Sequence, residues 1–329
     1  MLTAEPLAPE VAAAVRLLEG SVVEIGDVRD DPDAIEAVRA AEDPITSFLD
    51  EQAARDVQMV RTQPELPGGG YTVFGRDQRY VAMYGHPNTA RLGVLGEQNA
   101  KKSVARLERM ITRHEEASDE NIVGAFEIIA TVATAGAGDK KTYSADTSID
   151  DLRPLVDAAR ENDVLVVIDL QPGRESFLDQ AKRYEELLRE PHVGLALDPE
   201  WRLTAKQKHL EQIGSVSIEE VNEVGDWLAG LTREHALPQK LYVLHQFRSS
   251  MIRDRDRLDT SHPELATLIH VDGQGPRGAK FDTWDHLRKG APQGVTWGWK
   301  NFIDEDPDML DPKETWTKVR PKPRLVTYQ

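Results

Sequence analysis

Short runs of apolar, often β-branched residues alternate with longer amphipathic stretches through most of this chain. Eight of the short runs predict β-strands, at residues 80–85, 123–130, 164–170, 193–198, 240–247, 267–272, 295–300 and 325–328. The stretches between them predict helices at 99–116, 149–162, 175–189, 218–235 and 281–288, two of which follow capping-box patterns at Ser148 and Ser217. Such alternation is typical of parallel βαβ units, and eight strands predict a (β/α)8 TIM-type barrel of the α/β class.

Both ends of the chain depart from this rhythm. Residues 9–19 and 33–59 have the pattern of helices, and the glycine-rich stretch 66–70 then interrupts the chain. We therefore expect an N-terminal helical extension at 1–65 and a barrel domain at 66–329. The connection 302–323 is rich in Pro and Asp with little helical character, so we expect irregular last repeats and an N-terminal helix covering the wall there. A doubly wound sheet is the alternative fold, but residues 85–88 lack its glycine-rich phosphate loop.

Composition narrows the range of partners. The chain has 57 acidic and 40 basic residues, a formal net charge of -17, which argues against a nucleic-acid partner. There is no cysteine, which excludes disulfides, thiolate nucleophiles and Cys-ligated metals. No apolar run approaches the ~18 residues of a transmembrane segment, and the start does not resemble a signal peptide. We expect a cytoplasmic protein, or a secreted or cell-envelope protein if a leader was removed. The oligomeric state is not predicted.

Functional side chains stand at the carboxyl end of nearly every predicted strand. In chain order they are His86, Glu127, Asp169, Gln171, Asp198, Glu200, Trp201, His245, Gln246, Asp272, Gln274, Trp297, Trp299 and Lys300. Catalytic groups of (β/α)8 enzymes lie at this end of the barrel. Strand parity puts Asp169 with Gln171, and His270 with Asp272, on one face. We therefore expect one site in which these side chains converge.

The carboxylates are the candidate catalytic groups. Asp198 and Glu200 stand two residues apart at a strand end, where one can protonate a leaving group while the other stabilises a developing cation. Crowding with Glu127, Asp169 and Asp272 would raise some carboxyl pKa values and leave a general acid protonated at neutral pH. The alternative is structural, because Asp-Pro-Glu is also a pattern for an N-terminal helix cap.

The remaining candidates would bind substrate. Trp201, Trp297 and Trp299 offer faces on which sugar rings stack, although tryptophans also fill barrel cores. Histidines His86, His245 and His270 are candidate bases or ligands, or structural residues. The side chains of Lys300 and of Arg174, which follows Pro172-Gly173, could neutralise carboxylates, while Gln171, Gln246 and Gln274 offer amides.

Several stretches resemble a group of uncharacterised actinobacterial proteins. They are YGHP at 84–87, GVLGEQ at 93–98, FEIIA at 126–130, DLQPGR at 169–174 and LDPEW at 197–201, within a resemblance that covers about residues 65–329. Similar members often look secreted or lipid-anchored. More distantly, the Asp-x-Glu after the fourth strand and the Trp-containing seventh strand resemble lysozyme-type muramidase and chitinase barrels. That resemblance implies acid chemistry on Asp198 and Glu200, although Gly85-His86 stands where muramidases have an acidic residue.

Three functions are consistent with these features. The first is a glycosidase-like hydrolase without a cofactor, acting on a carbohydrate or cell-wall polymer with Glu200 as general acid and Asp198 as its partner. The second is a hydrolase or lyase that uses a divalent metal ion held by Asp169, Asp198, Glu200, His245 and Asp272, although no His-x-His or His-Glu-x-x-His motif is present. The third is a non-catalytic barrel that binds a carbohydrate or peptide. A small molecule or carbohydrate is the expected partner.

Overall fold

The computed structural model describes residues 2–3, 23–24, 28–41 and 49–329. Its main sheet contains eight parallel strands: β3 (Gln78–Gly85), β4 (Asn121–Ala133), β6 (Leu165–Leu170), β7 (Val193–Leu197), β9 (Lys240–Gln246), β11 (Leu265–Val271), β12 (Thr296–Asn301) and β13 (Leu325–Tyr328). Each strand pairs with the next, and β13 pairs with β3 to close the ring. The predicted (β/α)8 TIM-type barrel is therefore confirmed, and all eight predicted strands match.

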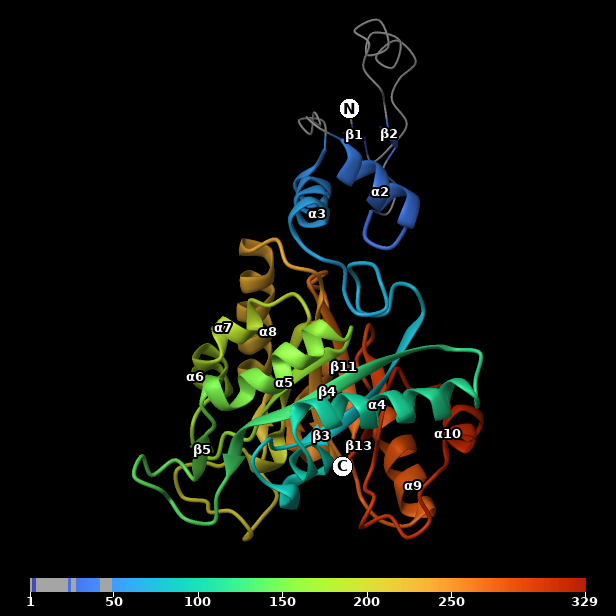
Figure 1. Cartoon of the computed structure of the whole chain (residues 1–329). Coiled ribbons are helices and arrows are strands. Elements are labelled where there is room, and N and C mark those ends of the chain that lie inside the picture. Colours follow the sequence, from blue (N-terminus) through green and yellow to red (C-terminus); the bar gives the residue numbers. More distant parts are fainter. Residues whose placement is uncertain (1, 4–22, 25–27, 42–48) are drawn as a thin grey trace, which may run out of the picture.

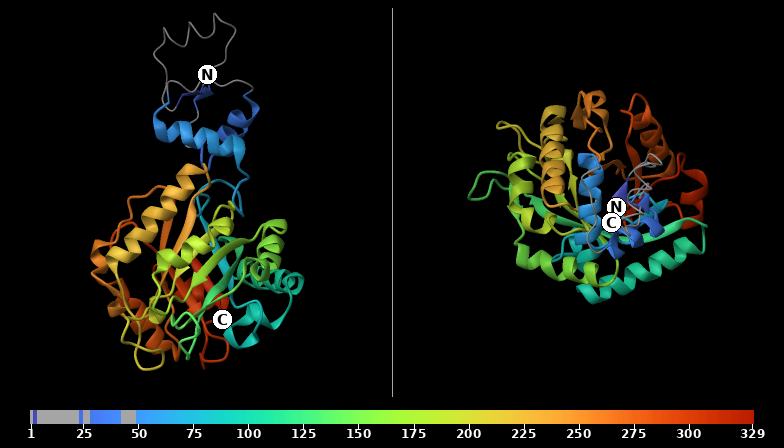
Figure 2. Two further views of the ribbon diagram at one scale, coloured as in Figure 1. Left: turned by 90° about the vertical axis from the view of Figure 1, so that its left-hand side faces the viewer. Right: turned by 90° about the horizontal axis from the view of Figure 1, so that it is seen from above.

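Helices surround the barrel, as the view along its axis shows (Figure 2). They are α4 (Ala100–Glu115), α5 (Ile149–Glu161), α6 (Phe177–Arg183), α7 (Glu185–Leu188), α8 (Ile218–Glu234), α9 (Arg277–Arg288) and α10 (Pro312–Lys318). Ser148 and Ser217 cap α5 and α8 by accepting hydrogen bonds from backbone N–H groups, as their sequence patterns predict. Helix α10 was not predicted, although Asp311 and Glu314 form a full capping box at its start.

Short elements fill the connections. The 3-10 helices are η1 (Ala90–Leu92), η2 (Val94–Glu97), η3 (Pro199–Trp201), η4 (Ser249–Met251) and η5 (Arg255–Arg257). The short strands are β1 (Leu2–Thr3), β2 (Val23–Glu24), β5 (Ser144–Asp146), β8 (Val216–Ser217) and β10 (Ile252–Arg253). Among the residues that the structure describes, no helix has both the length and the apolar character needed to cross a membrane.

The barrel interior is apolar at the amino ends of the strands. Small and branched side chains fill it, among them Ala82, Val167 and Val243. The segment before β3 closes this end, because Leu66 and Val73 pack into the same cluster and the Tyr80 hydroxyl donates a hydrogen bond to the Val73 carbonyl. An enclosed base leaves the carboxyl ends of the strands as the open end of the barrel.

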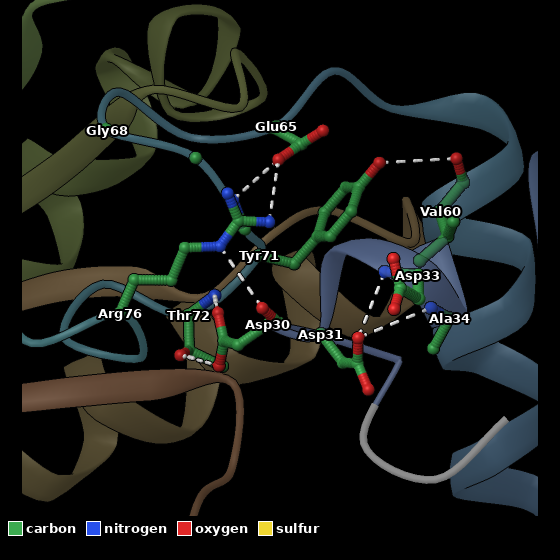
Figure 3. Close-up of polar contacts among 12 residues, drawn as sticks. Asp30, Asp31, Asp33, Ala34, Val60, Glu65, Gly68, Tyr71, Thr72 and Arg76 are labelled. Carbon is green, nitrogen blue, oxygen red and sulfur yellow. Dashed lines mark hydrogen bonds and ion pairs between the residues drawn. The ribbon is translucent and has the colours of Figure 1, made fainter. Parts of the chain in front are cut away.

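The N-terminal extension sits against that closed base. It contains α2 (Pro32–Ala40) and α3 (Glu51–Thr62), so the single helix predicted at 33–59 is wrong, and the helix predicted at 9–19 lies outside the described residues. Figure 1 shows α2 and α3 at the end of the barrel opposite the C-terminus. Figure 3 shows how they attach: Arg76 pairs with Glu65, and Tyr71 donates to the Val60 carbonyl.

The described helices of the extension do not cover the wall beside β13. Helices α2 and α3 do not reach it, because they pack on the base of the barrel. Helices α4 and α10 meet there instead. His114 of α4 hydrogen-bonds to the Tyr328 hydroxyl at 2.9 Å and lies edge-on to Trp316 of α10. Helix α10, which was not predicted, thus covers part of the wall that we expected an N-terminal helix to cover.

Candidate active site

A pocket of about 630 Å³ opens at the carboxyl ends of the strands. Its polar lining comes from many different strand ends and comprises Tyr84, Gln171, Asp198, Glu200, Asp272, Gln274 and Lys300. Trp201, Phe247 and Phe302 contribute aromatic faces, and Arg248 a second cation. A concave site of this size at this end of a (β/α)8 barrel suits a small molecule.

A buried cluster of charged side chains lies beside the pocket. It consists of Glu127 on β4, Asp169 on β6, His245 on β9 and His270 on β11, all with exposed fractions of 0%. The cluster contacts the pocket lining at two points, because the Tyr84 hydroxyl donates to Asp169 at 2.8 Å and Asp272 bonds to His245. Inward strand positions therefore form two polar layers, one buried and one lining the pocket.

His245 is the centre of the buried cluster. Its Nε2 lies 2.6 Å from Glu127 Oε1, and its Nδ1 lies 2.9 Å from Asp272 Oδ2. Glu127 also accepts a hydrogen bond from the Thr327 hydroxyl at 3.2 Å. Both nitrogens of this imidazole are thus engaged by carboxylates.

Several buried atoms of the cluster and of the adjoining Asp272 have no hydrogen-bond partner among the described residues. They are Asp169 Oδ1, Asp272 Oδ1 and both ring nitrogens of His270. Asp169 Oδ1 lies 3.9 Å from His245 Nε2, and His270 Nδ1 lies 3.8 Å from Glu127 Oε2. Buried polar atoms are normally paired, so these atoms have the capacity to contact a ligand or an ion.

Glycine 298 makes room for one of these rings. A Cβ atom at Gly298 would lie 2.7 Å from His270 Cδ2, closer than side chains tolerate. The His270 ring therefore occupies the space that the side chain of any residue other than glycine would take at position 298.

Electrostatics polarise the buried cluster. Burial opposes charge on both His245 and Glu127, but the Glu127 carboxylate and the hydrogen bond that His245 donates to Asp272 raise the pKa of His245 well above its usual value. Despite burial, His245 likewise holds the pKa of Glu127 well below the usual carboxyl range. Burial lowers the pKa of His270, whose imidazole is neutral at neutral pH.

The acids nearer the pocket shift the other way. Burial, reinforced by the negative charge of Asp272, raises the pKa of Glu200 to about 7. Burial and the neighbouring Glu200 raise the pKa of Asp198 well above its usual value, and burial raises the pKa of Asp169 to about 6. The sequence-based expectation of raised carboxyl pKa values thus describes three of the five acids. Because these three carboxyl groups interact with one another, the protonation of each depends on that of the others.

Ten predicted site residues come together in these two layers: Glu127, Asp169, Gln171, Asp198, Glu200, Trp201, His245, Asp272, Gln274 and Lys300. Asp198 also accepts a weak hydrogen bond from the backbone N–H of Glu200 at the start of η3, so the expected cap is present too. His270, named from the sequence only as one of three candidate bases or ligands, completes the site together with Tyr84 and Thr327, which had been assigned no role. Tyr84 could have been found by parity, because Tyr80 and Ala82 on the same face are in the barrel interior.

Five predicted residues lie elsewhere. His86 bonds to the Thr147 hydroxyl, Arg174 stacks on Tyr143, and Gln246 bonds to Arg255. Trp297 and Trp299 point to the outer face of the barrel, where both contact the ring of Trp284 on α9. The expectation that these two tryptophans line the site is therefore wrong.

Together, the fold and the site define a (β/α)8 barrel with an enzyme-like pocket. No family model matches the chain, and no curated protein matches it. Among solved structures, it is similar to an HpcH/HpaI aldolase from Desulfitobacterium hafniense DCB-2, with 12% identity, coverage of 77% of this chain and 86% of that chain, and a TM-score of 0.38. It is also similar to the spore coat polysaccharide biosynthesis protein spsE from Bacillus subtilis, with 11% identity, 68% and 60% coverage, and a TM-score of 0.29. Similarities this weak say nothing about function, and the resemblance to muramidases stays a prediction.

Proposed function

We propose that this protein is a divalent-metal-dependent enzyme, a lyase or hydrolase, that acts on a small polar molecule in the pocket. The observation that carries the proposal is the buried cluster of Glu127, His245 and His270, whose candidate ligand atoms all lie within 4.8 Å of one another. The unpartnered Asp169 Oδ1 offers a fourth ligand. Of the five metal ligands predicted from the sequence, this set keeps Asp169 and His245. Glu127 and His270 take the place of Asp198, Glu200 and Asp272.

The partners of these ligands support the proposal. Asp272 accepts from His245 Nδ1, which leaves Nε2 directed at Glu127 and Asp169. Tyr84 donates to Asp169 Oδ2 and leaves Oδ1 free. Metal-binding histidines and carboxylates are commonly oriented by such outer hydrogen bonds. Neutral imidazole and carboxylate ligands suit Mn²⁺, Fe²⁺, Co²⁺ or Zn²⁺.

When bound, a divalent ion would supply Lewis-acid polarisation of a substrate oxygen. The chain's own groups handle the proton. Glu200, with a pKa of about 7, exists in both protonation states at neutral pH and lines the pocket. A carboxyl with these properties can deliver or accept a proton at the substrate.

Metal analysis tests the proposal. Protein purified without chelator should contain about one equivalent of a transition metal, and the chelator-treated protein should bind Co²⁺ or Mn²⁺ in calorimetric titrations. The His270→Gln variant should bind the ion at least tenfold more weakly. His114→Gln, which changes a buried histidine at the α4 wall, should bind it normally. No bound metal and a melting curve unaffected by chelator would contradict the proposal.

One observation favours a second function, a metal-free hydrolase of the glycosidase type. Glu200 has the raised pKa expected of a general acid, and Trp201 lines the same pocket. Against it, Trp297 and Trp299 face away from the pocket, so two of the three expected stacking surfaces are missing. Turnover of a glycan panel that survives chelator but is lost in Glu200→Gln would favour this function. Ligand binding with no turnover at all would indicate a binding protein.

A further inference from the structure

Lys300 is a buried lysine that lines the pocket. It stands on the inward face of β12 with an exposed fraction of 3%. Its ammonium lies 3.7 Å from the centroid of the Tyr84 ring and 5.2 Å from that of Phe302. Aromatic rings attract the positive charge of the Lys300 ammonium through cation–π contacts. They do not replace the oxygen acceptors that its three N–H donors would normally contact.

The other two buried lysines show what Lys300 lacks. Lys240 donates to the carbonyls of Glu190 and Pro191, near the amino ends of the strands. Lys280 donates to Asp306 at 2.7 Å and to the carbonyls of residues 273 and 300. Within residues 49–329, by contrast, no hydrogen bond or ion pair satisfies the ammonium of Lys300. A charged group held in this way is costly unless the pocket contents satisfy it.

The nearby acids do not meet this need. Their charges interact with Lys300, which counteracts the rise in the pKa of Asp169 and of Glu200. None of them makes an ion pair with it within 4.0 Å, and Asp169 and Asp272 direct one oxygen each to Tyr84 and His245 instead. The ammonium is therefore near negative charge but free to contact a ligand.

A second cation lines the same pocket. Arg248 lies beside the Phe247 ring, 5.8 Å from its centroid, and no described acidic side chain pairs with it. Buried Lys300 and exposed Arg248 thus both offer positive charge to this one pocket. Acidic groups of ligands are commonly bound by such cations, with lysine acting as a point charge.

We propose that the pocket binds a small anionic substrate whose acidic group, a carboxylate or a phosphoryl group, contacts Lys300. This anion site rests on the proposed function in one respect, which is that the same pocket is taken to be the substrate site. A volume of about 630 Å³ limits the ligand to a small molecule, and the acids that line the same pocket are suited to its hydroxyl groups.

Anion binding by the chelator-treated protein tests this. Inorganic phosphate and malonate serve as probes, in calorimetric titrations of wild type, Lys300→Met and Lys300→Gln. Lys289→Met, which removes an exposed lysine at the end of α9, is the matched control. Wild type and the control should bind at least one probe, and both Lys300 variants should bind it at least tenfold more weakly. The preferred probe distinguishes a phosphoryl from a carboxylate ligand.

Two outcomes would overturn the proposal: no binding of either probe by wild type, or equal affinity in wild type and a folded Lys300 variant. Repeating the titrations with Mn²⁺ separates this proposal from the proposed function. If the protein binds no metal but still binds the anion through Lys300, only the metal-dependent function is refuted. If the protein binds the metal and the Lys300 variants bind the anion as tightly as wild type does, only the lysine site is refuted.

Discussion

Asp272→Asn is the most informative change to the buried cluster. The carboxylate accepts from His245 Nδ1 at 2.9 Å, so it fixes which ring nitrogen faces Glu127 and gives the imidazole a negative partner. Asparagine has nearly the same shape but no charge. Loss of such an outer partner typically weakens metal binding about 10- to 100-fold, which is roughly 1.4 to 2.8 kcal/mol.

The same change should destabilise the metal-free protein. There, His245 is an imidazolium between two buried carboxylates, and a hydrogen bond to a charged group contributes about 1.5 to 3 kcal/mol. We therefore expect a fall of that size in the free energy of unfolding. Both losses originate from one contact, so they should appear together in the same variant.

Calorimetric Mn²⁺ titration and urea unfolding of chelator-treated protein measure the two effects. Glu264→Gln is the control, because Glu264 pairs with Arg233 at 2.8 Å near the amino ends of the strands, far from the cluster. It should leave metal affinity unchanged even if it lowers stability. If Asp272→Asn binds Mn²⁺ as tightly as wild type does, His245 is not a metal ligand oriented by Asp272.

Three further predictions concern packing and protons. Gly298→Ala should displace the His270 ring, lowering stability by about 1 to 3 kcal/mol and weakening Mn²⁺ binding, as unfolding and titration will show; unchanged metal affinity would mean that the ring is not a ligand. Burial lowers the pKa of Lys240 to about 7, so the unfolded chain binds the extra proton between pH 7 and 10.5 and stability should rise with pH across that window. Lys240→Met should lose that slope, a difference of about 3 kcal/mol between pH 7.5 and 9.5 in urea unfolding, and equal slopes in the variant and in wild type would exclude this contribution of Lys240. Metal binding should release protons, since His245 and Asp169 must lose theirs to bind the ion, and identical heats of titration in buffers of different ionisation enthalpy would refute this.

The barrel was readable from the sequence because its strands are buried on both faces. Helices outside and side chains inside leave near-continuous apolar runs, and each of the eight coincides with a strand. Helix α10 was missed for the opposite reason. Its surroundings are rich in Pro and Asp, which suggests a loop. Asp311 and Glu314 nevertheless stand at capping-box spacing, and Pro312 takes the first helical position, where proline is tolerated.

The site was predicted in part, and strand parity explains the errors at Gln246, Trp297 and Trp299. Successive residues of a strand face opposite sides, so Trp299 and Lys300 cannot both enter the pocket, and neither can His245 and Gln246. Lys300 and His245 face inward, which puts Trp299 on α9 and Gln246 against Arg255. Parity alone does not say which alternative faces inward. Gly298 decides it for β12, since only a glycine fits opposite His270.

The upper interior of the barrel carries more negative than positive charge. Five carboxylates, Glu127, Asp169, Asp198, Glu200 and Asp272, share it with His245 and Lys300 as cations. Full ionisation would leave an excess of three negative charges in a poorly solvated space, so protons must be taken up or a cation must bind. Raised pKa values at three of the acids show the first response, and the unpartnered atom Asp169 Oδ1 beside His245 is available for the second. Under the proposed metal dependence, an ion held by Glu127 and Asp169 would compete with the proton on Asp169, and its positive charge would lower the pKa values of the neighbouring acids that line the pocket.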